Sequence, residues 1–178
     1  MAQLGADCKV RVADIEEYFD TTLPIEEAMM KIARKKAEAV AEEQDEKAVI
    51  LAADTMVFFD GMPLGKPCDE ADAFRMLTVL SGAWHEVYTA FCIHTAQKVV
   101  CRCVRTRVKF YELTEEEIES YIDTGEPMDK AGGYGIQERG ALLVERIEGD
   151  YFNVMGLPVG ELQQTLRTEF GLSLTEED

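Results

Sequence analysis

The clearest indication of the fold is Lys47-Ala48-Val49-Ile50-Leu51-Ala52-Ala53, a run that ends in Asp54-Thr55. After the lysine, this run is apolar on both faces, which is typical of a central strand buried on both sides. Asp60-Gly61, a few residues later, favours a tight hairpin turn. We therefore predict a strand over residues 47–53 with Asp54 at its end, where the ligand sites of open α/β sheets lie.

Helical patterns lie on both sides of this strand. The spacing predicts a helix from about Pro24 to Glu43, whose apolar stripe contains Lys36 as a misfit that snorkelling of its side chain would explain. A second helix is expected from the cap Asp69 to Leu80, and a third after the capping box that Thr114 begins. A final helix is expected to end near Phe170-Gly171.

Further strands are expected over residues 85–94, 97–111 and 141–147. Because helices and strands interleave while hairpins intrude, the sequence predicts an α/β fold with a mixed sheet. No linker, repeat or low-complexity tract divides the chain, so we expect one domain over residues 1–178, with residues 172–178 as a frayed tail.

Composition restricts the class of protein and its partners. An apolar fraction of 47% excludes disorder across the whole chain. The 18 basic and 35 acidic residues give a net charge of −17, which disfavours a nucleic acid or an anionic membrane as partner. The first residues lack the features of a signal peptide, so the five cysteines are expected as reduced thiols in the cytoplasm. We expect these cysteines and the two histidines to be structural.

Charge and glycine gather at a few positions that suit phosphate chemistry. A carboxylate such as Asp54 is costly to bury unless a cation or hydrogen bonds offset it. Lys66 lies in a constrained turn between a glycine and a proline, Lys36 adds a second cation, and the three glycines of Asp129–Gln137 allow close approach of a ligand. Together they favour a metal-assisted reaction on a phosphate chain, although each is also found in ordinary caps and turns. The Walker and nucleophile-elbow patterns are absent.

Five segments resemble, in register, the Maf family of nucleotide pyrophosphatases: Ala53–Thr55, Gly65–Pro67, Leu80–Gly82, Gly125–Gln137 and Asn153–Pro158. The resemblance runs from about Gln3 to Gly171. It implies an elongated, twisted sheet flanked by helices, and hydrolysis of a nucleoside triphosphate to the monophosphate and pyrophosphate with Mg²⁺ or Mn²⁺. The form of the glycine-rich segment resembles the branch acting on dTTP and UTP. A cytoplasmic enzyme that cleans the nucleotide pool, modified pyrimidine nucleotides included, is expected, and a homodimer is compatible with it.

The resemblance also implies roles for individual residues. The family's catalytic positions correspond to Asp54, Lys66 and Gln137, its substrate-binding positions to Lys36, Lys66, Lys130 and Gln137, and its metal-binding positions to Glu16 and Asp54. Asp54 is expected to bind metal or to activate the water that attacks the α-phosphorus, while the lysines hold the triphosphate. Glu17 is the alternative to Glu16 if the register differs by one residue.

The sequence departs from the family at its beginning. Family members start with a strand and a Ser-x-Ser-Pro-Arg-Arg loop that grips the phosphates, and neither is found here. We therefore expect this chain to lack the family's first strand and to be weakly active, because losing one preorganised donor typically costs roughly 10²–10³ in rate. A start codon assigned too far downstream is favoured over a truncated form.

Two other functions compete with the pyrophosphatase. One is a non-catalytic nucleotide-binding or cell-division-linked interaction protein, which would bind nucleotide without turnover. The other, a phosphatase with an aspartyl nucleophile, is disfavoured because Met56 stands where a second aspartate would follow Asp54.

Overall fold

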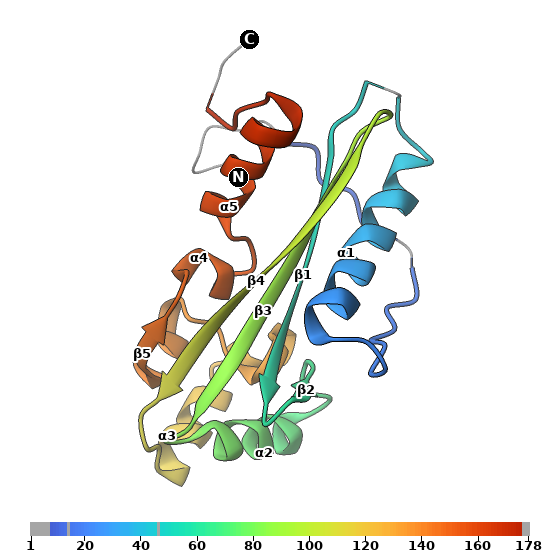
Figure 1. The fold of residues 1–178 in the computed structure, drawn as a ribbon. Helices are drawn as coiled ribbons and strands as arrows, with labels where there is room; N and C mark the ends of the chain where they lie inside the picture. The colour runs from blue at the N-terminus through green and yellow to red at the C-terminus, as the bar shows by residue number, and fades with distance from the viewer. Residues whose placement is uncertain (1–7, 14, 46, 176–178) are drawn as a thin grey trace. The chain divides into compact units, whose positions relative to one another are not determined.

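The structure is a computed structural model that describes residues 8–13, 15–45 and 47–175. Its centre is an open five-stranded sheet with the order β2-β1-β3-β4-β5 (Figure 1). The strands are β1 (Ile50–Phe59), β2 (Met62–Leu64), β3 (Trp84–His94), β4 (Val99–Phe110) and β5 (Val144–Glu148). The edge strands β2 and β5 both pair antiparallel with their neighbours. The predicted α/β class, with a sheet and flanking helices, is confirmed.

Most predicted helices are present. They are α1 (Ile25–Ala41), α2 (Glu70–Leu80), α3 (Glu115–Ile122), α4 (Tyr151–Val154) and α5 (Val159–Thr165), with 3-10 segments η2 (Glu126–Asp129), η3 (Ala131–Gly133) and η4 (Glu138–Leu143) and the π-helical η5 (Leu166–Phe170). The predicted caps are confirmed: Asp69 accepts a hydrogen bond from the Asp72 amide at 2.8 Å, and Thr114 forms a capping box with Glu117. Residues 141–143, expected in a strand, belong instead to η4.

Strand β1 is longer than predicted. The prediction that Asp54 ends this strand is wrong, because β1 runs on to Phe59 and leaves Asp54 in its interior. The β-branched and aromatic residues after Asp54 favour extended pairing, so the chain turns only at the predicted hairpin. There Asp60 and Gly61 adopt positive φ angles of 48° and 75°, and Phe59 pairs with Met62.

The chain divides into two compact units, and the division falls within β1, β3 and β4. The first unit comprises residues Met1–Asp54, Ala90–Cys103 and Leu157–Asp178, and the second comprises Thr55–Thr89 and Val104–Gly156. Within the described residues, no helix is long and apolar enough to cross a membrane.

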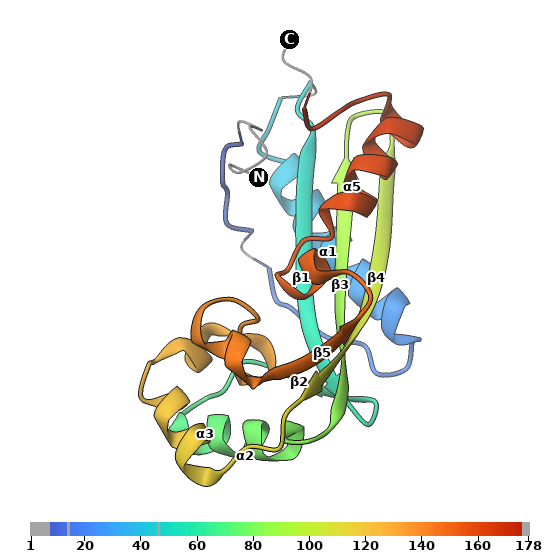
Figure 2. The ribbon, with the colours of Figure 1, turned by 90° about the vertical axis from the view of Figure 1, so that its left-hand side faces the viewer.

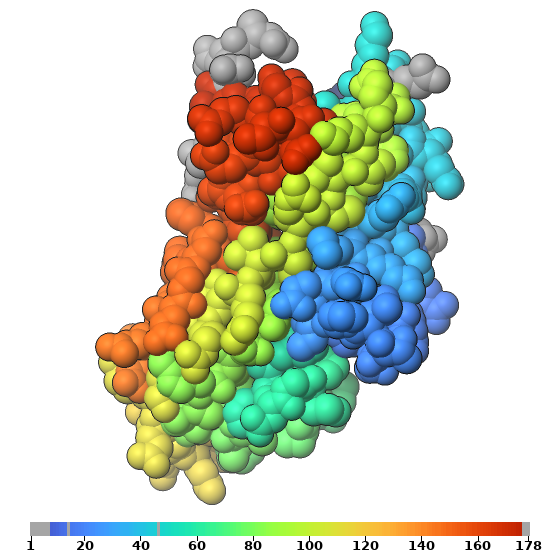
Figure 3. Space-filling model, viewed as in Figure 1, coloured from blue at the N-terminus to red at the C-terminus, as the bar shows by residue number. Residues whose placement is uncertain are grey.

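In the first unit, α1 and α5 cover opposite faces of the sheet (Figures 1 and 2). Alternate residues of β3, Phe91 and Ile93, are buried against Leu162 of α5 and Leu166 of η5. Beside η5 the start of β4 reaches the surface (Figure 3), where Lys98 forms an ion pair with Glu169.

Cysteines line the other face of this part of the sheet. Cys92 of β3 and Cys101 of β4 lie with their sulfur atoms 2.7 Å apart as free thiols. Burial, helped by the charge of Glu26 in α1, raises the pKa of Cys103 to about 12. Helix α1 thus covers the cysteine face, and its buried residues are Ala28, Met29, Ile32, Ala33 and Ala37.

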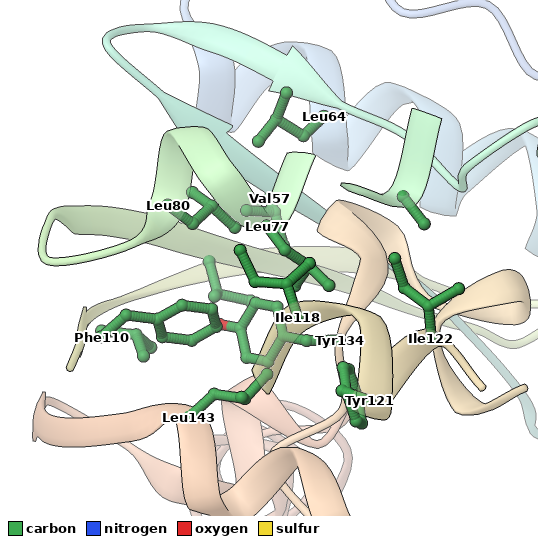
Figure 4. Packing of buried hydrophobic residues seen from close by; sticks show 13 residues of the cluster. Val57, Leu64, Leu77, Leu80, Phe110, Ile118, Tyr121, Ile122, Tyr134 and Leu143 are labelled. Carbon is green, nitrogen blue, oxygen red and sulfur yellow. The ribbon is translucent and has the colours of Figure 1, made fainter. Parts of the chain in front are cut away.

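In the second unit, α2, α3 and the glycine-rich segment pack on one hydrophobic cluster (Figure 4). Leu77, Ile118 and Tyr134 point into it from these three elements. His85 lies in the same core, with its Nε2 atom 2.7 Å from the Tyr134 hydroxyl and its ring edge-on to Phe110. Burial lowers the pKa of His85 to about 4, so the imidazole is neutral near pH 7.

Candidate functional site

A partly buried ion pair marks the first unit. The Lys36 ammonium lies 2.6 Å from Oδ1 of Asp54 and 2.9 Å from Oε1 of Glu17. Only 12% of the Asp54 side chain and 18% of the Lys36 side chain are exposed, against 52% for Glu17. Two carboxylates from different parts of the chain therefore meet one cation in a largely desolvated position.

Helix α1 and strand β1 bring Lys36 and Asp54 together. Lys36 follows the apolar face of α1, which includes the buried Ile32 and Ala33, so it faces the sheet with them. Asp54, from the interior of β1, meets its ammonium there. Lys36 therefore does not extend to solvent by snorkelling, contrary to the expectation from the sequence. Its place in the apolar stripe is explained by its ion pair with Asp54.

The electrostatics keep Lys36 charged. Burial alone would lower the pKa of Lys36, but the hydrogen bonds and charges of Asp54 and Glu17 outweigh it and raise that pKa. A cation held in a partly dry site interacts more strongly with an incoming anion than one in bulk water. The arrangement can thus bind a phosphate oxygen through Lys36 and present a carboxylate beside it.

Of the two candidate glutamates, Glu17 is the one that reaches this cluster. Glu16 is exposed and forms no ion pair or hydrogen bond with another described residue. Within the described ranges, no group of three or more His, Cys, Asp or Glu side chains is arranged to hold a metal. The carboxylates of Asp54 and Glu17 share the Lys36 ammonium as their cation.

In the second unit, the turn that carries Lys66 is joined to the glycine-rich segment. The Gly132 amide donates to the Gly65 carbonyl at 2.9 Å. Gly132 has a φ of 72°, and a Cβ atom added there would lie 2.9 Å from Val57 side-chain carbons, so only glycine fits. The backbone on both sides of this hydrogen bond is therefore closely fixed.

Asp129, in the glycine-rich segment, is influenced by two lysines. Lys130 forms an ion pair with Asp129, and this hydrogen bond is the main reason that the pKa of Asp129 is lowered, with a smaller contribution from the charge of Lys66. Lys66 itself is exposed. Gln137 is also exposed and has an extended backbone immediately before η4.

The structure thus groups the sequence-predicted residues unit by unit. Lys36, Asp54 and Glu16 belong to the first unit, and Lys66, Lys130 and Gln137 to the second. Within the first unit Lys36 and Asp54 touch. Within the second, the charges of Lys66 and Lys130 both act on Asp129.

A buried polar network in the second unit was not predicted. Asn153 is 0% exposed and donates through Nδ2 to the Val87 carbonyl and to the Thr106 hydroxyl, both at 3.0 Å. The Thr89 hydroxyl donates to the Asn153 carbonyl at 2.8 Å and lies 2.8 Å from the hydroxyl of Thr55. The available signal was a polar residue, Thr89, inside an apolar strand.

Comparison with known proteins gives consistent matches. A family model described as Maf-like protein matches residues 1–169. The chain is 46% identical to a dTTP/UTP pyrophosphatase of Acetivibrio thermocellus, over 98% of this chain and 90% of the relative. It is 47% identical to a dTTP/UTP pyrophosphatase of Bacillus cytotoxicus over 89% of this chain and 83% of that protein. A Bacillus cereus protein of the same name is 43% identical over 96% and 88%.

Proposed function

This chain belongs to the Maf family, and from that premise we propose that it hydrolyses dTTP and UTP to the nucleoside monophosphate and pyrophosphate. The observation that carries the proposal is the partly buried pair of Lys36 and Asp54, which offers a cation for phosphate and a carboxylate for a water molecule. The dTTP/UTP pyrophosphatase name of several relatives supports this substrate class.

In the proposed reaction, each of these residues has a distinct role. Asp54 takes a proton from the water that attacks the α-phosphorus, and the bond to the bridging oxygen breaks so that pyrophosphate leaves. Lys36 holds the Asp54 carboxylate by a 2.6 Å hydrogen bond and offsets negative charge on the phosphates. Lys66, Lys130 and Gln137 are proposed to bind the triphosphate.

We also propose that Mg²⁺ or Mn²⁺ takes part, held by Asp54 together with Glu17 or Glu16. When bound, such an ion offsets the charge of the triphosphate and of the departing pyrophosphate. The support is that the carboxylates of Asp54 and Glu17 lie close enough to share one cation, the Lys36 ammonium, and that Mg²⁺ commonly uses one or two carboxylates together with substrate phosphates.

The cell compartment and the partners remain predictions. The cytoplasm is proposed because all five cysteines are free thiols, which suits a reducing compartment. The net charge of −17 disfavours a nucleic acid or an anionic membrane as partner, whereas a small anionic substrate needs only a few local cations to offset its charge. A homodimer stays a prediction.

Replacement of Asp54 by asparagine tests the proposal. Asp54→Asn should lower kcat for dTTP and UTP by about 10²- to 10⁴-fold, because an amide cannot act as the general base. Pyrophosphate release with Mg²⁺ or Mn²⁺ is the measurement, and Asp123→Asn, at an exposed position directly after α3, is the control. Nucleotide binding without turnover, even by a form extended upstream to include a Ser-x-Ser-Pro-Arg-Arg loop, would support the non-catalytic alternative instead.

A further inference from the structure

The two ends of the glycine-rich segment are tied together by one carboxylate. Oε1 of Glu126 accepts a hydrogen bond from the Arg139 amide at 3.4 Å, and Oε2 accepts one from the Gly140 amide at 3.3 Å. Glu126 begins η2, and the two amides lie in η4, two and three residues after Gln137. The carboxylate therefore closes residues 126–140 into a loop and fixes the backbone next to Gln137.

The Tyr121 hydroxyl supports the middle of the same loop. It accepts a hydrogen bond from the Gly135 amide at 3.2 Å. Burial, with a smaller contribution from the nearby Glu126 carboxylate, raises the pKa of Tyr121 to about 12, so the hydroxyl keeps its proton near neutral pH. The Lys130 side chain passes close to Gly135, because a Cβ atom added to Gly135 would lie 3.4 Å from Cε of that lysine.

The loop is tightly packed around Gly140. A Cβ atom added to Gly140 would lie 2.0 Å from the Gly135 carbonyl oxygen and 2.7 Å from the Tyr121 hydroxyl. Glu138, directly after Gln137, has a φ of 54°, a conformation that a non-glycine residue keeps only where its surroundings hold it. The contacts of Glu126 and Tyr121 are such surroundings.

We propose that Glu126 is a positioning residue, which presents Gln137 to the substrate through the amides of Arg139 and Gly140, with Tyr121 doing the same for Lys130 through Gly135. This inference rests on the proposed pyrophosphatase function, in which Gln137 and Lys130 bind the triphosphate. Glu126 itself touches only the loop. Its effect on the reaction is to hold a binding group in place before substrate arrives, which favours the transition state more than the bound substrate.

A double-mutant cycle tests this assignment. Glu126→Gln keeps the size of the side chain but replaces one acceptor oxygen by an NH₂ group, so one backbone amide loses its acceptor. We expect kcat to fall roughly tenfold while KM changes by less than about threefold. In a Gln137→Ala background, the same substitution should cause little further loss, because its effect passes through Gln137. Glu119→Gln, at an exposed position of α3, is the matched control.

The outcomes separate this inference from the function on which it rests. If neither this chain nor a form extended upstream with a Ser-x-Ser-Pro-Arg-Arg loop hydrolyses dTTP or UTP, the proposed function fails and this inference fails with it. If the protein is active and the effects of Glu126→Gln and Gln137→Ala simply multiply, the function stands and the positioning role is overturned. A purely structural role would lower the melting temperature without this coupling.

Two further measurements cover a variant that folds poorly. Tyr121→Phe keeps the buried ring and removes only the hydroxyl, so it offers a milder second cycle with Lys130→Ala. Amide hydrogen exchange should become faster at Arg139 or Gly140 in Glu126→Gln and at Gly135 in Tyr121→Phe. Unchanged exchange at Arg139, Gly140 and Gly135 would show that the loop does not depend on these side chains and would overturn the proposal.

Discussion

At the scale of single residues, His85 is the buried titratable group whose protonation can be followed most simply. It lies in the core of the second unit, 2% exposed, between Tyr134 and Phe110. Nδ1 has no hydrogen-bond partner within the described residues, and a charged imidazole there would be poorly compensated. The protein therefore folds with this ring neutral.

The first prediction concerns the pH dependence of stability. The pKa of His85 is lowered to about 4 from 6.5, so the unfolded chain takes up this proton first as the pH falls. This group should destabilise the protein progressively between pH 6.5 and pH 4, by up to about 3 kcal/mol, and change nothing further below that window. Urea unfolding at a series of pH values is the measurement.

His85→Gln should remove this part of the pH dependence while still offering a hydrogen bond to Tyr134. His94→Gln controls for the loss of a histidine. If the free energy of unfolding of His85→Gln depended on pH between 6.5 and 4 as steeply as that of the unchanged protein, the assignment would be contradicted.

At the scale of elements, the glycine-rich segment and β1 meet at Gly132. Replacing Gly132 by alanine should destabilise the protein by at least about 1–3 kcal/mol, because a methyl group there overlaps Val57 and the left-handed φ strains it. Gly160→Ala, in α5 with nothing within 4 Å of the added carbon, should be neutral or slightly stabilising. Thermal and urea unfolding measure both.

A second substitution distinguishes crowding from backbone strain at this position. Val57→Ala in the Gly132→Ala background should recover part of the loss if the overlap matters. Equal stabilities of Gly132→Ala and Gly160→Ala would refute the close approach.

The elements also show what the sequence could predict. Helix ends and the hairpin were predictable because local groups set them: Asp69 and Thr114 cap their helices, and Asp60-Gly61 makes the turn. The continuation of β1 through Asp54 was missed, because a buried carboxylate in a strand depends on a cation from another element. Likewise the loop contacts of Glu126 join residues 13 and 14 positions apart, which no local pattern indicates.

At the scale of the whole molecule, net charge is the dominant property. A net charge of −17 on 178 residues causes self-repulsion in the folded state. Helix α1 adds to it locally, since it has no basic residue in its last turn and Glu42 and Glu43 follow there, beside the negative end of its dipole.

The melting temperature should therefore rise when salt is added from about 0.01 M to about 0.15 M, as the screening length falls from roughly 30 Å to roughly 8 Å. Replacing both Glu42 and Glu43 by glutamine should stabilise the protein at low salt and reduce this response. Calorimetry at several NaCl concentrations measures both effects. A melting temperature that is constant or falls over this range would contradict the expectation.

The division of the chain within β1, β3 and β4 has a practical consequence for expression. Each unit is assembled from separate stretches, three for one and two for the other, so no single contiguous gene fragment encodes either. Any truncation meant to excise one half would cut through strands and discard their continuation. Biochemical dissection of this protein therefore has to proceed by substitution, or by rearranging the order of the coding segments.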